Sequence, residues 1–254
     1  AGARAIAQNA NPPTDTFPGI EHKVHDVTNL TEEAIKSLGQ NAIGHLFAGP
    51  ECKDLSKLRL IGRGGKTLPS TARPGLAGPT GQLFRTFLKL FKCIRKHNPD
   101  CIYFVENVDF SDMPNDWKEV CDVLGEPHVI NAKDHSYTHR NRAYWTNLQL
   151  PASWKDGHPP RLNLAECLDE GRTINRAAPT TITSRWRGDD DAPIQDTTNP
   201  VMVLDEQYTE PQYLRPHEAE QLMGLPRDCT AALGVSNLQR LKGIGNAWDL
   251  NIVK

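Results

Sequence analysis

The sequence predicts an α/β fold with a mostly parallel, doubly wound sheet. Apolar segments with the spacing of strands alternate with segments that have the spacing of helices. One apolar run, at residues 101–105, is continuous, as in a strand that is buried on both faces. Strands that alternate with helices in this order favour a parallel sheet covered by helices. The clearest helical repeat consists of Leu83, Phe87, Leu90, Phe91 and Ile94.

Each element follows from a local signal. Asn29 and Glu32 form the pattern of a helix start, and that helix ends at Gly39. The Asn98-Pro99 break ends the helix that carries the apolar repeat. We expect strands at 22–27, 43–47, 101–105, 128–132, 143–146 and 250–253, and further helices at 79–97, 115–124, 162–168, 215–223 and 236–242.

Composition excludes several classes of protein. The chain has 254 residues, 29 basic and 31 acidic, so its formal charge of −2 is not that of a strongly basic nucleic-acid-binding protein. No apolar run approaches the roughly 20 residues that cross a bilayer. The chain begins at Ala1 without a methionine, which suggests a piece of a longer protein. Residues 151–213 are rich in Pro, Asp, Thr and Arg and read as a small irregular insertion.

The six cysteines give no metal or redox motif. No two of them have the C-x-x-C spacing of zinc ribbons or thioredoxin-like proteins. Scattered cysteines in a chain without a leader favour reduced intracellular thiols over disulfides. Most should be small buried hydrophobes, and the chemical question is whether one of them differs.

Polar side chains follow the predicted strands where ligands gather in open α/β sheets. Asp26 closes the first strand, Cys52 follows the second on a Gly-Pro turn, and Glu106 closes the third. Arg140 and Arg142 flank the start of a later strand. A cysteine and a carboxylate at neighbouring strand ends suit nucleophilic catalysis with a proton-managing partner.

Several ordered motifs resemble those of the DNA (cytosine-5) methyltransferases. They are GPECKDLS at residues 49–56, ENV at 106–108 and HRNR at 139–142. Three later stretches resemble the animal de novo DNA methyltransferases most: LAECL at 164–168, TITSR at 181–185 and GNAW at 245–248. The resemblance runs from about residue 25 to 253. It implies a Rossmann-like methyltransferase sheet, with residues 1–150 and 214–254 as the catalytic domain and 151–213 as a small target-recognition segment.

The resemblance implies a covalent mechanism. Carbon 5 of cytosine is a poor nucleophile, and a thiolate that adds to carbon 6 turns the ring into an enamine-like species. Cys52 is then the nucleophile, and Glu106 holds the ring nitrogen and the exocyclic amine. Arg142, together with Arg140, positions the ring through planar donors. The target cytosine lies inside a duplex, so it must be flipped out.

The same resemblance assigns a cofactor, a DNA surface and partners. S-adenosylmethionine contacts Asp26, Val27 and Thr28 at one end and Asn246, Ala247 and Trp248 at the other. The loop at residues 53–73 has six basic residues and one acidic residue, a net +5, and its glycines suit a loop that closes over DNA. The resemblance implies no metal. It implies that the catalytic domain associates side by side with an identical or related catalytic domain. In a eukaryote it implies a nuclear protein. The DNA-binding residues are Lys57, Arg59, Arg63 and Lys66, with Arg185 and Arg187 in the insertion.

Two departures from the family pattern keep other readings open. Glu51 stands where the family has a proline before the nucleophile, and a carboxylate beside a thiol opposes thiolate formation. The first cofactor motif, a strand that runs into a Gly-rich loop, is not found before residue 25, so we expect an N-terminally incomplete sheet. The alternatives to an active DNA methyltransferase are a catalytically silent partner of an active paralogue and a methyltransferase for transfer RNA.

Overall fold

The computed structural model describes residues 30–62, 65–152, 154, 163–174, 182–184, 186–187, 194–195 and 202–253. The chain divides into two compact units. One comprises Glu21–Ile130 and Asn141–Leu150, and the other comprises Ala1–Ile20, Asn131–Arg140 and Pro151–Lys254. The chain therefore passes from one unit to the other between Arg140 and Asn141. The predicted strand at 22–27 lies outside the described residues.

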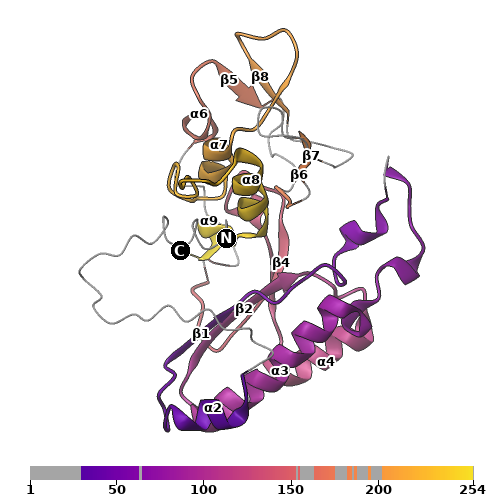
Figure 1. Ribbon diagram of the computed structural model, residues 1–254, viewed down its shortest axis with the longest axis vertical. Helices are drawn as coiled ribbons and strands as arrows, with labels where there is room; N and C mark the ends of the chain where they lie inside the picture. Colours follow the sequence, from indigo (N-terminus) through magenta and orange to yellow (C-terminus); the bar gives the residue numbers. More distant parts are fainter. Residues whose placement is uncertain are drawn as a thin grey trace. The chain divides into compact units, whose positions relative to one another are not determined.

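A mixed sheet of four strands forms the centre of the first unit (Figure 1). Strand β1 (His45–Ala48) runs parallel to β2 (Ile102–Val108). Strand β4 (Asn141–Thr146) lies on the other side of β2 and runs antiparallel to it, and β3 (His128–Asn131) follows at the edge. The expectation of a mostly parallel sheet is therefore wrong for the pair of β2 and β4. The α/β class itself is confirmed.

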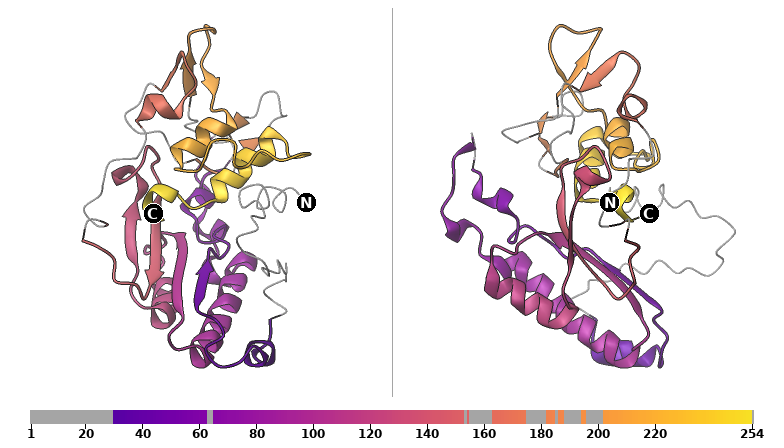
Figure 2. Two further views of the ribbon diagram at one scale, coloured as in Figure 1. Left: turned by 90° about the vertical axis from the view of Figure 1, so that its left-hand side faces the viewer. Right: turned by 180° about the vertical axis from the view of Figure 1, so that it is seen from behind.

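Helices α3 (Pro79–His97) and α4 (Pro114–Leu124) lie side by side along one face of this sheet (Figure 2). Both begin with a proline, whose missing N–H costs nothing in the first turn of a helix. Arg85 on α3 pairs with Glu119 on α4, and helix α2 (Glu32–Ser37), capped by Thr31, packs against α3. Between helices and sheet lies a core that includes Leu55, Phe84, Phe91, Val105, Phe110 and Trp145.

The second unit combines short strands with helices. Its core of buried apolar side chains includes Ile182, Val203, Leu222, Leu241 and Ile244. Strand β8 (Met202–Asp205) pairs with β5 (Arg172–Ile174) and β9 (Gln212–Tyr213), and β6 (Trp186–Arg187) pairs with β7 (Ile194–Gln195). The helices are α6 (Leu164–Cys167), α7 (Pro216–Leu222), α8 (Asn237–Asn246) and α9 (Leu250–Val253).

The last element differs from the prediction. The apolar run at the end of the chain, predicted as a strand, forms the short helix α9. Asp249 precedes it, and its Oδ1 accepts hydrogen bonds from the backbone N–H and the side-chain amide of Asn251. A side-chain acceptor at this position satisfies an N–H that a helix start leaves open, so capping outweighs the strand preference of Ile252 and Val253. No helix among the described residues is long and apolar enough to span a membrane.

Candidate active site

The loop that carries Cys52 leaves the carboxyl end of β1 and is tied to the end of β2. Asn107, which is buried, donates a hydrogen bond from Nδ2 to the carbonyl oxygen of Pro50 at 2.9 Å. Cys52 itself is half-buried, and its carbonyl oxygen accepts hydrogen bonds from the N–H groups of Leu55 and Ser56. These bonds form a tight turn directly after the thiol. Because β1 and β2 are parallel, with Ala48 opposite Val105, Cys52 lies beyond the carboxyl ends of these strands, where Glu106 also lies.

Asp54 fixes the same turn to the start of α3. Its Oδ2 accepts a hydrogen bond from the N–H of Thr80 at 2.8 Å, and the Thr80 hydroxyl accepts one from the N–H of Asp54 at 3.1 Å. A Cβ atom on Gly78 would lie 2.3 Å from Asp54 Oδ2, so a side chain at this position would displace the Asp54 carboxylate. Burial raises the pKa of Asp54, but the bonds from Thr80 and the charge of Arg59 outweigh it and hold that pKa below its ordinary value.

Arg73 holds the far side of the loop. Its guanidinium is buried and donates from Nε and Nη2 to the carbonyl oxygen of Leu55. The same group forms a bidentate pair with Asp112, at 2.6 and 3.1 Å. The hydrogen bonds from Arg73 hold the pKa of Asp112 below its ordinary value. An arginine with both edges engaged is preorganised for this role in a way that lysine is not.

Glu106 and Arg142 meet in an ion pair at the end of β2. Arg142 Nε lies 2.7 Å from Glu106 Oε1, and their side chains are only 14% and 11% exposed. Because β4 runs antiparallel to β2, with Val108 opposite Arg142, the start of β4 reaches the carboxyl end of β2. Glu106 Oε1 is buried, and apart from this ion pair it makes no hydrogen bond within the described residues. A buried carboxylate oxygen with unused capacity is a ready acceptor for a ligand N–H.

Arg140 does not join this pair. It is buried in the other unit, where its guanidinium donates to the carbonyl oxygens of Ile182, Gly245 and Ala247. The turn of residues 246–248 follows α8: Asn246 is exposed, and Ala247 and Trp248 are half-buried. Asp26, Val27 and Thr28 lie outside the described residues.

Comparisons with known proteins support one fold. No family model matches the sequence. A solved Dnmt2 methyltransferase from S. pombe has a TM-score of 0.61 with this chain at 14% identity, and the match covers 99% of this chain and 92% of that one. The methyltransferase EhMeth from Entamoeba histolytica gives 0.62, with the same identity and coverage. A Dnmt2 mutant from Spodoptera frugiperda gives 0.59, also at 14% identity, with 98% and 86% covered. The chain shares the fold of these methyltransferases.

In this methyltransferase fold the other cysteines are poor nucleophiles. All six cysteines are free thiols. Burial raises the pKa of Cys167 and Cys229 to about 11 and raises that of Cys93, Cys101 and Cys121 as well. A raised pKa leaves little thiolate at neutral pH. Cys101 and Cys167 are buried as predicted, whereas Cys93, Cys121 and Cys229 are half-buried.

The basic loop carries less free charge than the sequence count implies. Lys57 pairs with Asp112 at 3.7 Å, and Arg59 pairs with Asp54 at 3.4 Å and donates to the carbonyl oxygen of Ala72. Lys66 is exposed. Arg63 and Arg185 lie outside the described residues, as does the side chain of Arg187, whose backbone belongs to β6.

Glu51 has a basic neighbour in Lys53. Its carboxylate lies 3.4 Å from Lys53 Nζ, and both side chains are exposed, at 38% and 65%. The ammonium group partly offsets the field that the carboxylate exerts on the thiol between them. An exposed pair of this kind is screened by water and salt, so the offset is small.

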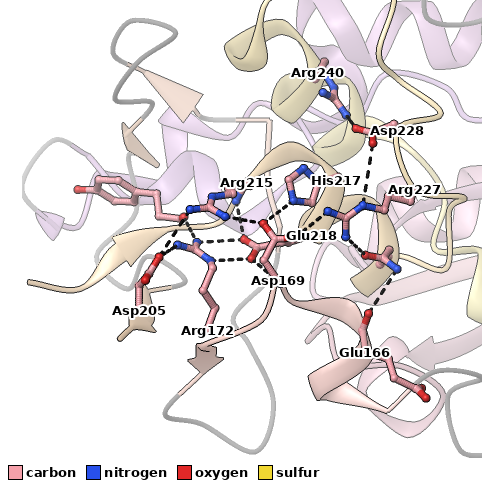
Figure 3. Close-up of polar contacts among 12 residues, drawn as sticks. Glu166, Asp169, Arg172, Asp205, Arg215, His217, Glu218, Arg227, Asp228 and Arg240 are labelled. Carbon is pink, nitrogen blue, oxygen red and sulfur yellow. Dashed lines mark hydrogen bonds and ion pairs between the residues drawn. The ribbon is translucent and has the colours of Figure 1, made fainter. Parts of the chain in front are cut away.

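A charge network in the second unit joins buried and exposed side chains, and the sequence did not predict it (Figure 3). Asp169 accepts hydrogen bonds from Arg215 and Arg227 and lies 2.8 Å from His217 Nε2. Arg172 is buried and pairs with Asp205 and Glu218. Its charge therefore serves the fold. The residues of this network come from three segments that are far apart in the sequence. Their spacing therefore does not predict that they are in contact.

Two groups of side chains have donors close enough together to ligate a metal. They are Glu32, Cys93 and His97, and Asp169, His217 and Glu218. In each, basic residues already neutralise the carboxylates: Lys36 and Lys96 contact Glu32, and three arginines contact Asp169 and Glu218. A second cation would meet repulsion at either place.

Proposed function

We propose that this chain is the catalytic domain of a DNA (cytosine-5) methyltransferase, which transfers a methyl group from S-adenosylmethionine to carbon 5 of cytosine. The observation that carries the proposal is the arrangement at the end of β2. Glu106 offers a buried carboxylate whose Oε1 is held in an ion pair with Arg142, while the neighbouring Asn107 holds the loop of Cys52. The fold shared with solved methyltransferases supports the same reaction class. The motifs favour the animal de novo branch and duplex DNA.

Each residue has a defined task. The thiolate of Cys52 adds to carbon 6 of the flipped cytosine, and the electron pair of the 5,6 double bond moves toward carbon 5. Glu106, in its protonated form, donates to ring nitrogen 3, so the adduct does not accumulate a full negative charge. Arg142 orients the ring carbonyl through its guanidinium. After carbon 5 has gained the methyl group, water takes its proton, the C–H electron pair restores the 5,6 double bond, and the carbon–sulfur bond breaks to release the Cys52 thiolate. Nitrogen 3 returns its proton to Glu106.

The residues available for the methyl donor fit that compound. S-adenosylmethionine supplies an electrophilic methyl group when bound. The half-buried ring of Trp248 and the exposed amide of Asn246 offer a stacking surface and hydrogen bonds of the kind that adenosine accepts. Asp26, Val27 and Thr28 complete the proposed set. Lys57, Arg59, Arg63 and Lys66, with Arg185 and Arg187 in the target-recognition segment 151–213, are proposed to contact the DNA backbone.

A trapping experiment tests the proposal. The purified chain is incubated with S-adenosylmethionine and duplex DNA that contains 5-fluorocytosine. Fluorine at carbon 5 cannot leave as a proton does, so the enzyme remains covalently attached and migrates as a protein–DNA adduct. Cys52→Ala should abolish the adduct, and the matched control Cys93→Ala, also a half-buried thiol, should retain it.

Other outcomes assign the alternatives. Absence of both the adduct and tritium transfer to DNA would overturn the proposal. Transfer to transfer RNA alone would favour the RNA methyltransferase. Binding to an active paralogue without any transfer would favour the silent partner.

A further inference from the structure

The segment of residues 136–140 holds the end of the chain through two hydroxyl groups. Ser136 Oγ and Thr138 Oγ1 donate to Asp249 Oδ2, at 2.8 and 2.7 Å. Asp249 is completely buried, and Ser136 and Thr138 are buried with it. The other carboxylate oxygen accepts the two bonds from Asn251. A buried carboxylate with four donors around it has a single favoured position.

Arg140, from the same segment, holds the preceding residues. Its Nη1 donates to the carbonyl oxygen of Gly245 at 3.2 Å, and its Nη2 donates to that of Ala247 at 2.8 Å. These carbonyls lie at the C-terminus of α8, where the carbonyl oxygens of the last turn have no helical N–H donors and carry partial negative charge. A buried guanidinium satisfies both needs at once.

The two sets of bonds enclose one short turn. Arg140 binds the turn through the carbonyl oxygens of Gly245 and Ala247. Asp249, the residue after Trp248, binds it through Ser136 and Thr138. A third constraint comes from Gly245, because a Cβ atom there would lie 2.2 Å from the backbone carbon of Thr183. The position of Asn246 and Trp248 therefore depends on these side chains rather than on the turn alone.

We infer that Ser136, Thr138, Arg140 and Asp249 form a clamp that positions the turn at residues 246–248 for S-adenosylmethionine, and that Arg140 is a positioning residue. This inference rests on the proposed function. It replaces the base-contacting role that the sequence predicts for Arg140, since a cytosine carbonyl would have to displace three backbone carbonyls from its guanidinium. The two arginines of the HRNR motif thus have different roles: Arg142 orients the cytosine, and Arg140 positions the turn that binds the methyl donor.

The test separates binding of the methyl donor from the chemical step. Arg140→Lys, which keeps the charge but loses the planar fork, should raise the KM and the Kd for S-adenosylmethionine about tenfold or more, with a smaller change in kcat. Thr138→Val, a milder change that removes one hydroxyl, should raise them about fivefold. Arg142→Lys is the matched control and should leave the Kd for S-adenosylmethionine unchanged while lowering methyl transfer.

Amide hydrogen exchange supplies a readout that does not depend on activity. Exchange at residues 245–250 should be faster in Arg140→Lys and Thr138→Val and unchanged in Arg142→Lys. A wild-type protein that methylates DNA, with variants of unaltered KM for S-adenosylmethionine, would overturn the clamp and leave the proposed function intact. A wild-type protein that neither binds S-adenosylmethionine nor methylates DNA would overturn both.

Discussion

Arg142 Nε lies 2.7 Å from Glu106 Oε1, although 36 positions of sequence separate the two residues. The antiparallel course of β4 against β2 creates this contact, because it returns the start of β4 to the end of β2. In a parallel arrangement Arg142 would lie beside the amino end of β2, at the opposite end of the strand from Glu106. The strand direction that the sequence did not predict is therefore what assembles the candidate site.

The Glu106 carboxyl should be needed for rate more than for folding. Glu106→Gln keeps the shape of the side chain but cannot supply a proton, so we expect kcat for tritium transfer to DNA to fall about 10²–10⁴-fold. Glu119→Gln, at the partly exposed pair with Arg85, is the control and should leave kcat within twofold. Undiminished transfer by Glu106→Gln would remove Glu106 from the mechanism.

Local signals predicted the elements whose stability is local. The apolar repeat and the flanking Pro79 and Asn98 fixed α3 to the bounds that the structure has. The strand prediction at residues 250–253 was wrong, because a few apolar residues suit a strand and a helix equally. The cap that Asp249 provides decides in favour of the helix. The predicted direction of β4 was wrong for a related reason, since the direction of a strand depends on the connection that leads into it and not on the residues of the strand.

Part of the candidate site can be proposed from the sequence for the same physical reasons. Cys52, Glu106 and Arg142 could be found because each follows or begins a strand of the sheet. The contacts of Arg140 and the network around Asp169 could not, because they join segments that are far apart in sequence and share no pattern. Only the folded backbone brings the carbonyl oxygens of Gly245 and Ala247 to Arg140.

Glu51→Pro should raise the rate of methyl transfer several-fold. Proline fixes φ of the residue before the nucleophile, and the change removes a carboxylate that disfavours the thiolate of Cys52. Lys53 offsets that carboxylate only weakly, since both groups are exposed. The single-turnover rate at several pH values measures the effect, with Glu51→Gln as a control that removes charge alone. A slower Glu51→Pro enzyme would mean that this loop needs the native backbone angles at residue 51.

Gly245→Ala should destabilise the protein strongly. The added Cβ would meet backbone atoms of Thr183 and Ser184 at 2.2 and 2.3 Å, and backbone cannot move aside as a side-chain tip can. We expect a loss of about 2–3 kcal/mol in the free energy of unfolding, measured by urea denaturation. Gly44→Ala is the matched control, because nothing lies within 4 Å of a Cβ there. Equal stability of the two variants would contradict the close packing of α8 on residues 183–184.

Asp169→Asn should lower stability at neutral pH and much less in acid. Burial raises the pKa of Asp169, but Arg227, Arg215 and His217 outweigh it and hold that pKa well below its ordinary value of 3.8. A carboxyl with a lowered folded-state pKa stabilises the protein fully above its unfolded pKa, and this contribution disappears as pH falls toward the folded value. We expect Asp169→Asn to cost about 1.5–3 kcal/mol at pH 7, and the difference from wild type to shrink steadily below pH 3.8.

The pH profile distinguishes this network from an ordinary surface pair. Asp122, which pairs with Lys118 one turn earlier on α4, is 59% exposed, and Asp122→Asn should change stability by less than about 0.5 kcal/mol. Urea denaturation of both variants from pH 3 to 7 gives the comparison. Because Arg215 and Arg227 would keep their charges while losing their shared anion, Asp169→Asn should also loosen the contact between residue 169 and His217 on α7. A stability difference that stays constant down to pH 3 would show that Asp169 acts through its shape, since its charge would then contribute nothing.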